Sequence, residues 1–441
     1  VFDEKRLFDV GTAEHKVWDF QGWKLGIAIC EDIWFDRVPR SVAEAGADLM
    51  IVPNASPWRR SIREERIQAF NRWHHELKLP YLFVNQVGGQ DELVFDGGSF
   101  AANASSAIIE LGKDFEVGLH SASFTSERGW GSTRGASRST GWGAEYRAAV
   151  LALGDYVNKN KFPGVVLGMS GGIDSALTAA MAVDALGADR VWCMMMPSKY
   201  TSEESLEDAR ACAELLGARY DTIPITPGVG ALHEMLEPMF SAPTETVTGK
   251  VIADTKNDTT DENIQSRLRA VTLMALSNKY GHMVVTTGNK SEMAVGYATL
   301  YGDMCGGYNA LKDFYKTEVF ELSNWRNEHH PRCGLGPEGE VIPQRIITKP
   351  PSAELREDQR DDDSLPPYDV LDDILRGLVD NEEDLDDIVK RGHDEKLVRR
   401  IEHLLYVAEY KRRQAPPGVK VGGKNFGRDR RYPITNRFRD D

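Results

Sequence analysis

The residues with the clearest chemical meaning lie at positions 170–175, where the sequence reads Ser-Gly-Gly-Ile-Asp-Ser. An apolar run at 164–169 precedes them and small apolar residues follow, a pattern that predicts a strand, a tight glycine loop and a helix. Small residues let the backbone approach a ligand closely, and the N–H groups that begin a helix favour an anion. The segment therefore predicts an anion site to which Ser170 and Ser175 add hydroxyl donors.

We expect a cation to bind together with that anion. Asp174 would repel a phosphate unless a cation lay between them, so the presence of Asp174 implies Mg²⁺. A second loop, 286–292, follows the apolar run 283–285, where Thr287 is a candidate phosphate or adenine donor and Glu292 a second oxygen ligand for Mg²⁺. Parallel sheets bind ligands at the ends of their strands, so we expect the two loops to share one site. The lysine that a Walker loop requires after its glycines is missing here.

Composition narrows the class of protein. The chain has 441 residues, enough for two or three domains, and 41% hydrophobic residues, enough for real cores. Its formal net charge of −15 argues against a nucleic-acid binder. Its five cysteines suggest neither a disulfide framework nor a zinc site. We expect no secretory leader and no membrane span, and hence a cytoplasmic protein.

The elements of the chain predict two α/β parts joined by a linker. Residues 1–120 form the first domain, with strands predicted at 23–30, 49–54 and 81–85 and helices at 38–47 and 62–77. Residues 121–143 are rich in Ser, Gly, Thr and Arg and are predicted to be the linker. Residues 144–441 form the second domain, where strands at 165–168, 191–196 and 283–287 alternate with helices. This alternation predicts a doubly wound parallel sheet.

The glycine loop resembles the pyrophosphate loop of ATP pyrophosphatases of the adenine nucleotide alpha hydrolase-like fold. Together with 286–303 and 410–418 it resembles NAD⁺ synthetase in particular. The resemblance implies that ATP contacts the first loop and the start of the second, at Gly168, Met169, Ser170, Gly171, Gly172, Ile173, Asp174, Ser175 and Thr287. It implies that deamido-NAD⁺ contacts Asn263, Glu292 and Lys411, and that Asp174 and Glu292 hold Mg²⁺. Taken without the resemblance, the helix of Asn263 could be a solvated charged face, and the basic cluster of Lys411 a plain helix end.

Cys30 is the candidate nucleophile of the first domain. It is predicted to end a buried strand, and a thiol at a strand-to-helix turn can be stabilised as thiolate by backbone N–H groups, although most intracellular cysteines are structural. The segments 1–6, 26–34, 54–57 and 85–88 resemble the nitrilase-like glutaminase domain of glutamine-dependent NAD⁺ synthetase. That resemblance implies a partial α/β/β/α sandwich in which Cys30 attacks the glutamine amide. Ser56 is a candidate glutamine contact.

The sequence departs from this family in three places. The family's catalytic Glu and Lys precede the segment that matches residues 1–4, so we expect these 441 residues to use ammonia and not glutamine. Ile62 occupies the position of a glutamine-contacting Lys, and Arg63 is the candidate substitute. The segments 241–258 and 328–340 are longer than the family pattern, and we interpret His329, His330 and Cys333 in the second as surface residues rather than a metal site.

The resemblance implies amidation of deamido-NAD⁺ to NAD⁺ through an adenylate, with release of AMP and pyrophosphate. The ammonia would come from glutamine, the cofactors would be ATP and Mg²⁺, and the protein would be a homo-oligomer. Three alternatives stay open: an ammonia-dependent synthetase with an inactive glutaminase remnant, another amidating ATP pyrophosphatase, and a non-catalytic nucleotide-binding protein. Glutamine use separates the first alternative, and pyrophosphate release in the presence of deamido-NAD⁺ excludes the last.

Overall fold

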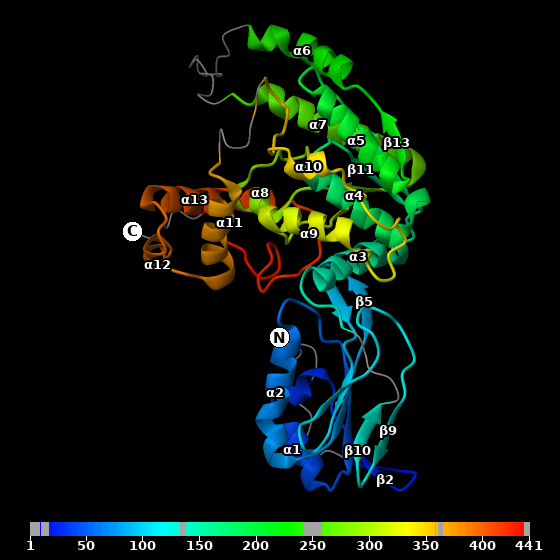
Figure 1. Cartoon of the computed structure of the whole chain (residues 1–441). Coiled ribbons are helices and arrows are strands. Elements are labelled where there is room, and N and C mark those ends of the chain that lie inside the picture. Colours follow the sequence, from blue (N-terminus) through cyan, green and yellow to red (C-terminus); the bar gives the residue numbers. More distant parts are fainter. Residues whose placement is uncertain are drawn as a thin grey trace. The chain divides into compact units, whose positions relative to one another are not determined.

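The computed structural model describes residues 9, 17–132, 138–241, 258–357, 359 and 365–435. The family-like segment 1–6 and nearly all of the longer segment 241–258 therefore lie outside the described residues. The chain divides into two compact units, Val1–Leu151 and Ala152–Asp441 (Figure 1). None of the helices in the described ranges is long and apolar enough to span a membrane.

The first unit is built on a six-stranded sheet with the order β1-β2-β3-β4-β7-β8. Strands β2, β3 and β4 are parallel and the outer pairs are antiparallel. The strands of the first unit, including the separate pairs β5–β6 and β9–β10, are β1 (Trp18–Phe20), β2 (Trp23–Ile27), β3 (Leu49–Asn54), β4 (Tyr81–Asn85), β5 (Val87–Gln90), β6 (Leu93–Asp96), β7 (Phe100–Ala102), β8 (Ile108–Glu110), β9 (Ala122–Thr125) and β10 (Gly129–Ser132). Its helices are the 3₁₀ turn Cys30–Trp34, α1 (Arg37–Glu44), α2 (Ile62–Leu77) and the start of α3 (Trp142–Lys159).

Alternation along the strands gives this sheet two apolar faces. Val52 and Phe83 belong to the core cluster that also contains Phe70 and Trp73 of α2. Leu25 and Ile51 pack on the other side with Trp130 of the β9–β10 hairpin. The segment 121–143, predicted as a linker, thus contains a hairpin that packs on this sheet, while the domain boundaries themselves stay a prediction.

The end of β2 differs from the prediction. The sequence predicts a strand that runs to Cys30, but β2 ends at Ile27 and Cys30 begins the 3₁₀ turn. The cause is local: the Asp32 carboxylate accepts a hydrogen bond from the Ile29 N–H at 2.8 Å, and the Asp32 N–H donates to the Ile29 carbonyl at 3.0 Å. These bonds close a turn where the ladder would otherwise continue.

The second unit is a five-stranded, all-parallel sheet with the order β13-β12-β11-β14-β15. Its strands are β11 (Val165–Gly168), β12 (Val191–Met195), β13 (Arg219–Thr222), β14 (Met283–Thr286) and β15 (Tyr308–Asn309). Its helices are α4 (Ile173–Leu186), α5 (Glu203–Leu216), α6 (Thr226–Phe240), α7 (Thr260–Tyr280), α8 (Lys290–Val295), α9 (Lys316–Glu328), α10 (Gln344–Thr348), α11 (Tyr368–Leu375), the π-helical turn Arg376–Asn381, α12 (Leu385–Lys390), α13 (Glu395–Val407) and α14 (Glu409–Arg412).

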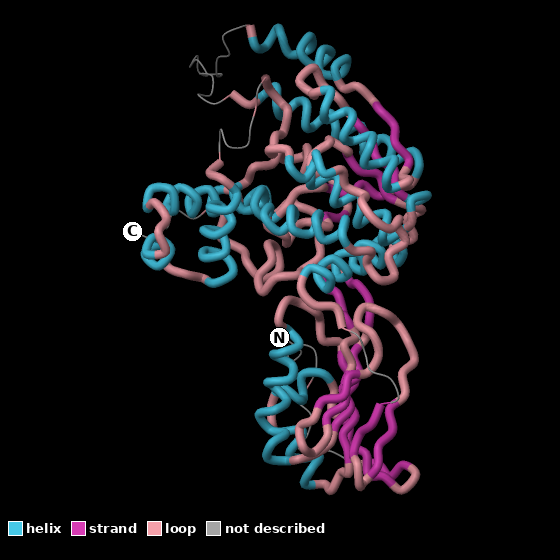
Figure 2. Tube along the Cα trace, viewed as in Figure 1, coloured by secondary structure: helices cyan, strands magenta, loops and turns pink. Residues whose placement is uncertain are grey.

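This strand order fixes where a ligand can bind. The chain runs from β11 outward to β13 on one side, then returns to β14 and β15 on the other, so the direction reverses between β11 and β14. Helices surround the sheet (Figure 2): α4 contacts β11 and β12, while α7 contacts β11 and β14. Doubly wound sheets bind ligands at such a reversal, beyond the carboxyl ends of the strands. The loops that follow β11 and β14 are the two that the sequence singles out.

Candidate active site

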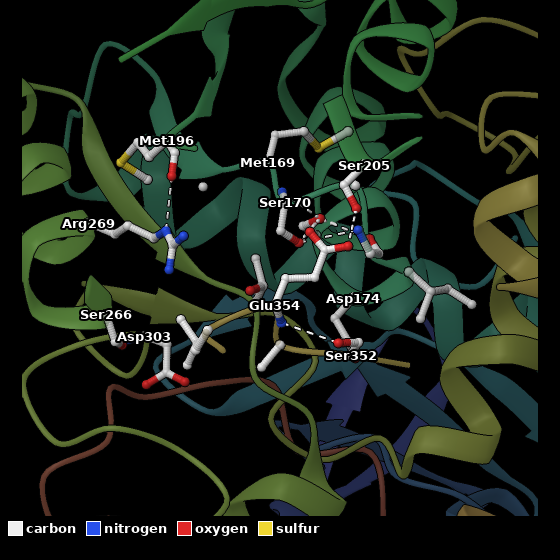
Figure 3. A pocket seen from close by; sticks show the side chains of 18 of the residues that line it. Met169, Ser170, Asp174, Met196, Ser205, Ser266, Arg269, Asp303, Ser352 and Glu354 are labelled. Carbon is white, nitrogen blue, oxygen red and sulfur yellow. Dashed lines mark hydrogen bonds between the residues drawn. The ribbon is translucent and has the colours of Figure 1, made fainter. Parts of the chain in front are cut away.

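A cavity of about 280 Å³ opens at this reversal (Figure 3). Its walls come from the loop after β11, the ends of β12 and β14, helices α7 and α8, and the segment 349–355. All nine residues predicted to contact ATP line the cavity, and so does Glu292. The sequence thus predicts one site from two loops more than a hundred residues apart, and the structure brings both to one cavity.

Hydroxyl groups set the shape of the glycine loop. Ser175 Oγ donates to the Gly172 carbonyl at 2.8 Å and accepts from the Ser170 N–H at 3.2 Å. The Gly172 N–H donates to Ser170 Oγ at 3.2 Å. The loop is therefore held in shape at the start of α4, the helix end that favours an anion.

Gly171 is required by the backbone. Its φ is +81°, and a Cβ there would lie 2.4 Å from the Ser205 carbonyl oxygen. Gly171→Ala should lower the free energy of unfolding by about 1–3 kcal/mol more than Gly281→Ala, because it adds a clash against main chain to the backbone strain. Gly281 is the control, since its φ is +77° and a Cβ there would make only an ordinary contact, 3.7 Å from Pro163. Chemical denaturation of both variants measures the difference, and equal losses would contradict the close approach.

Three charged side chains converge beside the loop. Lys316, at the start of α9, forms an ion pair with Asp174, and its Nζ lies 3.6 Å from Glu292 Oε1. Asn289 Nδ2 donates to the other Asp174 oxygen, Oδ1, at 2.9 Å. Asn289 and Glu292 also cap α8 reciprocally, which fixes the Glu292 carboxylate at the cavity. Two carboxylates that face one cation are a donor set that suits Mg²⁺, which binds to one or two carboxylates and takes its remaining ligands from phosphates and water.

The role of Lys316 could not be predicted from the sequence. Lys316 and Thr317 match the family pattern, but a lysine that begins a helix 142 residues after Asp174 gives no sign of which loop it meets. The parallel sheet provides the link, because β15 pairs with β14 and the chain then leads into α9. Its side chain is only 3% exposed, so its charge serves the two carboxylates rather than solvent.

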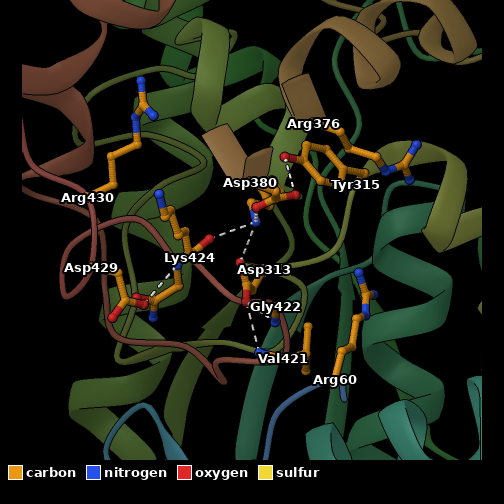
Figure 4. A network of polar contacts seen from close by, with 12 residues as sticks. Arg60, Asp313, Tyr315, Arg376, Asp380, Val421, Gly422, Lys424, Asp429 and Arg430 are labelled. Atoms are coloured by element: carbon orange, nitrogen blue, oxygen red, sulfur yellow. Dashed lines mark hydrogen bonds and ion pairs between the residues drawn. The ribbon is translucent and has the colours of Figure 1, made fainter. Parts of the chain in front are cut away.

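The buried ammonium group of Lys290 anchors the start of α8. Lys290 Nζ lies 2.9 Å from Asp313 Oδ1 and 3.0 Å from Asp380 Oδ1, and donates to the Lys424 carbonyl at 2.9 Å. Tyr315 donates its hydroxyl to Asp380 at 3.0 Å (Figure 4). Burial alone would lower the pKa of Lys290, but the two carboxylates raise it above its ordinary value. Lys290 therefore stays charged and holds α8 in place.

Two further residues that line the cavity, Glu354 and Arg269, make polar contacts of their own (Figure 3). The Glu354 carboxylate accepts from the hydroxyls of Ser202 and Ser205, both at 2.8 Å, and lies 3.4 Å from Lys349 Nζ. Arg269 Nε donates to the Met196 carbonyl at 3.1 Å, and burial lowers the pKa of this guanidinium to about 10. Arg269 therefore stays protonated at neutral pH and offers a positive charge to the cavity.

The two remaining deamido-NAD⁺ candidates flank the cavity without lining it. Lys411 Nζ donates to the carbonyls of Gly296 and Ala298, at 2.8 and 2.6 Å. Asn263 Oδ1 accepts from the Thr299 hydroxyl at 2.9 Å. Both side chains therefore hold the segment 296–299, which includes the cavity residue Tyr297.

In the first unit, Cys30 lies in a tight turn. Its φ is +47°, a conformation that few residues other than glycine adopt, and its side chain is partly exposed. A side chain on such a turn stands out from the backbone, as the nucleophile does in enzymes with a strand-to-helix nucleophile turn. The strain is an observation that the sequence does not reveal.

Ser56 and Arg63 form hydrogen bonds and an ion pair with residues of the first unit. Ser56 Oγ accepts from Arg66 Nε at 3.0 Å, and the Ser56 N–H donates to Asn85 at 2.9 Å. Arg63 forms an ion pair with Glu110 and lies 5.5 Å from the Phe100 ring, and burial lowers its pKa to about 10. Among the contacts of the described residues, neither side chain reaches Cys30, so their role in glutamine binding stays a prediction.

The segment 328–340 shows ordinary loop contacts for its histidines. His329 stacks on Trp325 with ring centroids 5.2 Å apart, and His330 Nε2 lies 3.0 Å from the Gly336 carbonyl. These are the surroundings of surface residues that pack on their own loop.

Two family comparisons match nearly the whole chain. The carbon–nitrogen hydrolase family matches residues 1–128, and the NAD synthase family matches residues 145–415. The fold and the cavity therefore define a ligase in which a nitrilase-like unit is joined to a synthetase unit of the ATP-pyrophosphatase type, as the sequence predicts.

Comparisons with individual relatives support the same class of protein. The chain is 49% identical over 446 residues to the glutamine-dependent NAD(+) synthetase of Rhodobacter capsulatus, covering 100% of this chain and 78% of the relative. It is 46% identical over 446 residues to that of Xanthomonas campestris pv. campestris, covering 99% and 77%. It superposes with a TM-score of 0.71 on a glutamine-dependent NAD+ synthetase from Acinetobacter baumannii solved with ADP, at 41% identity and covering 99% and 76%. The chain belongs to the glutamine-dependent NAD(+) synthetase family.

Proposed function

We propose that this chain amidates deamido-NAD⁺ to NAD⁺ with ATP and ammonia, and that glutamine supplies the ammonia where the family's catalytic Glu and Lys are present together with Cys30. The observation that carries the proposal is the convergence of Asp174, Glu292 and Lys316 on a glycine loop at the reversal point of the sheet. Family membership supports the choice of substrates, because the relatives are named for the same reaction.

The reaction has two steps. A carboxylate oxygen of the nicotinate ring attacks the α-phosphate of ATP, the bond to the β-phosphate oxygen breaks, and pyrophosphate leaves. Ammonia then attacks the activated carbonyl carbon and loses a proton, and AMP leaves with the carboxylate oxygen. Neither step needs a protein nucleophile, so this unit works by positioning and by charge neutralisation.

The charged side chains have distinct parts in the first step. The loop N–H groups and Lys316 face the pyrophosphate, whose negative charge grows as it leaves. Asp174 and Glu292 would hold Mg²⁺, which when bound supplies further positive charge to the phosphates. In the ligand-free protein Lys316 offsets one of the two negative charges of Asp174 and Glu292, so the three groups keep a net negative charge that favours a bound cation.

Cys30 is the proposed nucleophile that frees ammonia from glutamine. Its thiol would lose its proton and the thiolate would attack the glutamine amide carbon; the amide nitrogen would take up that proton and leave as ammonia, and water would then hydrolyse the thioester to glutamate and the free thiol. Ser56 and Arg63 are the proposed glutamine contacts, and Arg63 would have to leave its ion pair with Glu110 to reach the substrate.

The test is a balance of products. With ATP, deamido-NAD⁺ and ammonium, we expect these 441 residues to give NAD⁺, AMP and pyrophosphate in equal amounts by chromatography. With glutamine in place of ammonium, and with the family's catalytic Glu and Lys present in the same protein, we expect an equal amount of glutamate as well. NAD⁺ from ammonium but never from glutamine would favour the ammonia-dependent alternative. Pyrophosphate without NAD⁺ would mean a different acceptor.

We infer a cytoplasmic protein, because Cys30, Cys193, Cys212 and Cys305 are unpaired thiols, as expected in a reducing compartment.

We infer a homo-oligomer, because Met235 and Met239 of α6 and Val271 of α7 expose 60–72% of their surface. Light scattering of the purified protein, with Met235→Gln and Val271→Gln as dissociating variants, tests the oligomer.

Lys411→Ala should raise the KM for deamido-NAD⁺ more than the KM for ATP. The substitution removes the two hydrogen bonds that hold the segment 296–299 and a proposed contact with the dinucleotide. Losing hydrogen bonds from a charged group costs about 1.5–3 kcal/mol, or roughly 10-fold to 100-fold in KM. Steady-state kinetics with each substrate varied in turn measures the effect.

Arg413→Ala is the control for this prediction, because Arg413 is a nearby cation that pairs with Glu409 and donates to the Tyr432 carbonyl. A change in thermal stability with both KM values unchanged would show that Lys411 only ends its helix.

A further inference from the structure

Asp372 is a buried carboxylate that does not line the cavity yet binds both segments that supply its charges. It lies on α11, and its side chain is 0% exposed. Asp372 Oδ1 accepts from the Ser291 hydroxyl at 2.5 Å, and Oδ2 accepts from the Thr317 N–H at 2.8 Å. Ser291 Oγ in turn accepts from the Lys316 N–H at 2.9 Å. One carboxylate thus ties the start of α8 to the start of α9.

Each of these bonds is made next to a residue of the site. Ser291 directly precedes Glu292, and Thr317 directly follows Lys316. A shift of either helix start therefore moves a charged group of the cavity. Because Lys316 must lie between Asp174 and Glu292, the separation of the two helix starts sets the charge arrangement at the pyrophosphate loop.

The rest of α11 contacts the same turn. Tyr368 and Arg376 lie four residues before and after Asp372, so the three side chains share one helical face. The Lys316 ammonium lies 5.3 Å from the centre of the Tyr368 ring. Arg376 Nη2 lies 3.1 Å from Thr317 Oγ1. Two residues of α11 and the first residue of the π-helical turn that follows it thus contact the first turn of α9.

Burial makes the Asp372 carboxylate costly unless both of its oxygens are hydrogen-bonded. Burial raises its pKa, which the hydrogen bonds from Ser291 and Thr317 oppose. Its charge also lies at the N-terminus of the 13-residue helix α9, where the helix dipole favours an anion. Both bonds that offset the cost of burial go to the active-site segments and none goes elsewhere in the described chain.

We propose that Asp372 is a positioning residue for the adenylation step, one that keeps Lys316 between Asp174 and Glu292. This inference rests on the proposed function, because Lys316 acts there on the departing pyrophosphate. Asp372 itself touches no substrate.

The first experiment compares two buried carboxylates that bind opposite ends of α9. Asp372→Asn keeps the size but loses the charge and one acceptor oxygen at the first turn. Asp184→Asn does the same near the last turn, where Asp184 Oδ2 accepts from Arg326 Nε at 2.7 Å. Asp372→Asn should lower kcat of the ammonia-driven reaction by about 10-fold to 100-fold, the cost of misplacing a catalytic group by about 1 Å, and leave the KM for deamido-NAD⁺ unchanged. Asp184→Asn should lower the thermal midpoint but leave kcat unchanged.

The second experiment asks whether Asp372 acts through Lys316. In a Lys316→Met background, Asp372→Asn should lower kcat no further, because the group that it positions is gone. A full additional loss of kcat in that background would overturn the proposal, and so would a wild-type kcat in the single Asp372→Asn variant.

Calorimetry with ATP and Mg²⁺ separates this proposal from the function on which it rests. If the wild type makes no NAD⁺, the proposed function fails, but Asp372→Asn should still bind ATP more weakly than Asp184→Asn. Equal affinities would overturn the positioning role by itself. If Asp372→Asn does not fold, Ser291→Ala removes only the bridging hydroxyl and should give the same selective loss of kcat.

Discussion

Asp174→Asn should slow NAD⁺ formation from free ammonia by about 10²–10³-fold, the usual cost of removing one preorganised electrostatic contact from a transition state. Asn keeps the shape and can still accept the hydrogen bond from Asn289, so the loop should stay intact. What disappears is the charge that pairs with Lys316 and would hold Mg²⁺. The rate is measured at saturating ATP and deamido-NAD⁺.

Two further measurements sharpen this prediction. The Mg²⁺ concentration for half-maximal rate should rise in Asp174→Asn, whereas Asp184→Asn, on the same helix, should leave it unchanged. Activity within a few-fold of wild type would reject Asp174 as a metal ligand. A lost rate with an unchanged Mg²⁺ requirement would assign its role to holding Lys316 alone.

The local parts of this site can be predicted because their signals are local. The strand at 165–168 is a short apolar run bounded by glycines, and the helix at 62–77 has clear apolar spacing, so the predicted bounds of both elements are confirmed. The glycine loop carries its own chemistry in six consecutive residues. Its position at a reversal of strand order follows from the alternation of strands and helices.

The parts that could not be predicted depend on contacts between distant residues. Lys316 meets Asp174 across 142 positions, and Asp372 meets Ser291 across 81. No periodicity marks such pairs, since each is an ordinary helix residue until the fold is known. The β9–β10 hairpin could not be predicted either, because its sequence is mostly polar. Phe124 and Trp130 are its only large apolar residues, and the rest are mainly serines and glycines.

The segment around Cys30 contains one part that could be predicted from the sequence and one that could not. The strand before it is plain in the sequence, but the turn that ends the strand depends on the Asp32 carboxylate capping the Ile29 N–H. That single bond changes the expectation from a thiol at the end of a buried strand to a partly exposed thiol on a strained turn. Exposure lets a substrate reach the thiol, and backbone strain of this kind clusters at functional sites, so both observations fit the proposal that Cys30 is a nucleophile.

In a protein that carries the family's catalytic Glu and Lys together with this chain, Cys30→Ala should therefore abolish glutamine-dependent NAD⁺ synthesis, a loss of roughly 10⁴-fold or more, as expected when a catalytic nucleophile is removed. The ammonia-driven rate should not change, because Cys30 belongs to the first unit and the adenylation cavity to the second. Glutamate release and NAD⁺ formation, each assayed with glutamine and with ammonium, separate the two activities.

Cys193→Ala is the matched control. Cys193 is buried in β12, and burial raises the pKa of its thiol to about 12, so it is not a thiolate at neutral pH. Iodoacetamide should accordingly label Cys30 but not Cys193 in the folded protein, and glutamine should slow that labelling. Undiminished glutamate release by Cys30→Ala would make Cys30 a structural residue. A parallel fall of the ammonia-driven rate would mean that the substitution damages the fold, because a nucleophile that only releases ammonia is not needed once ammonia is supplied.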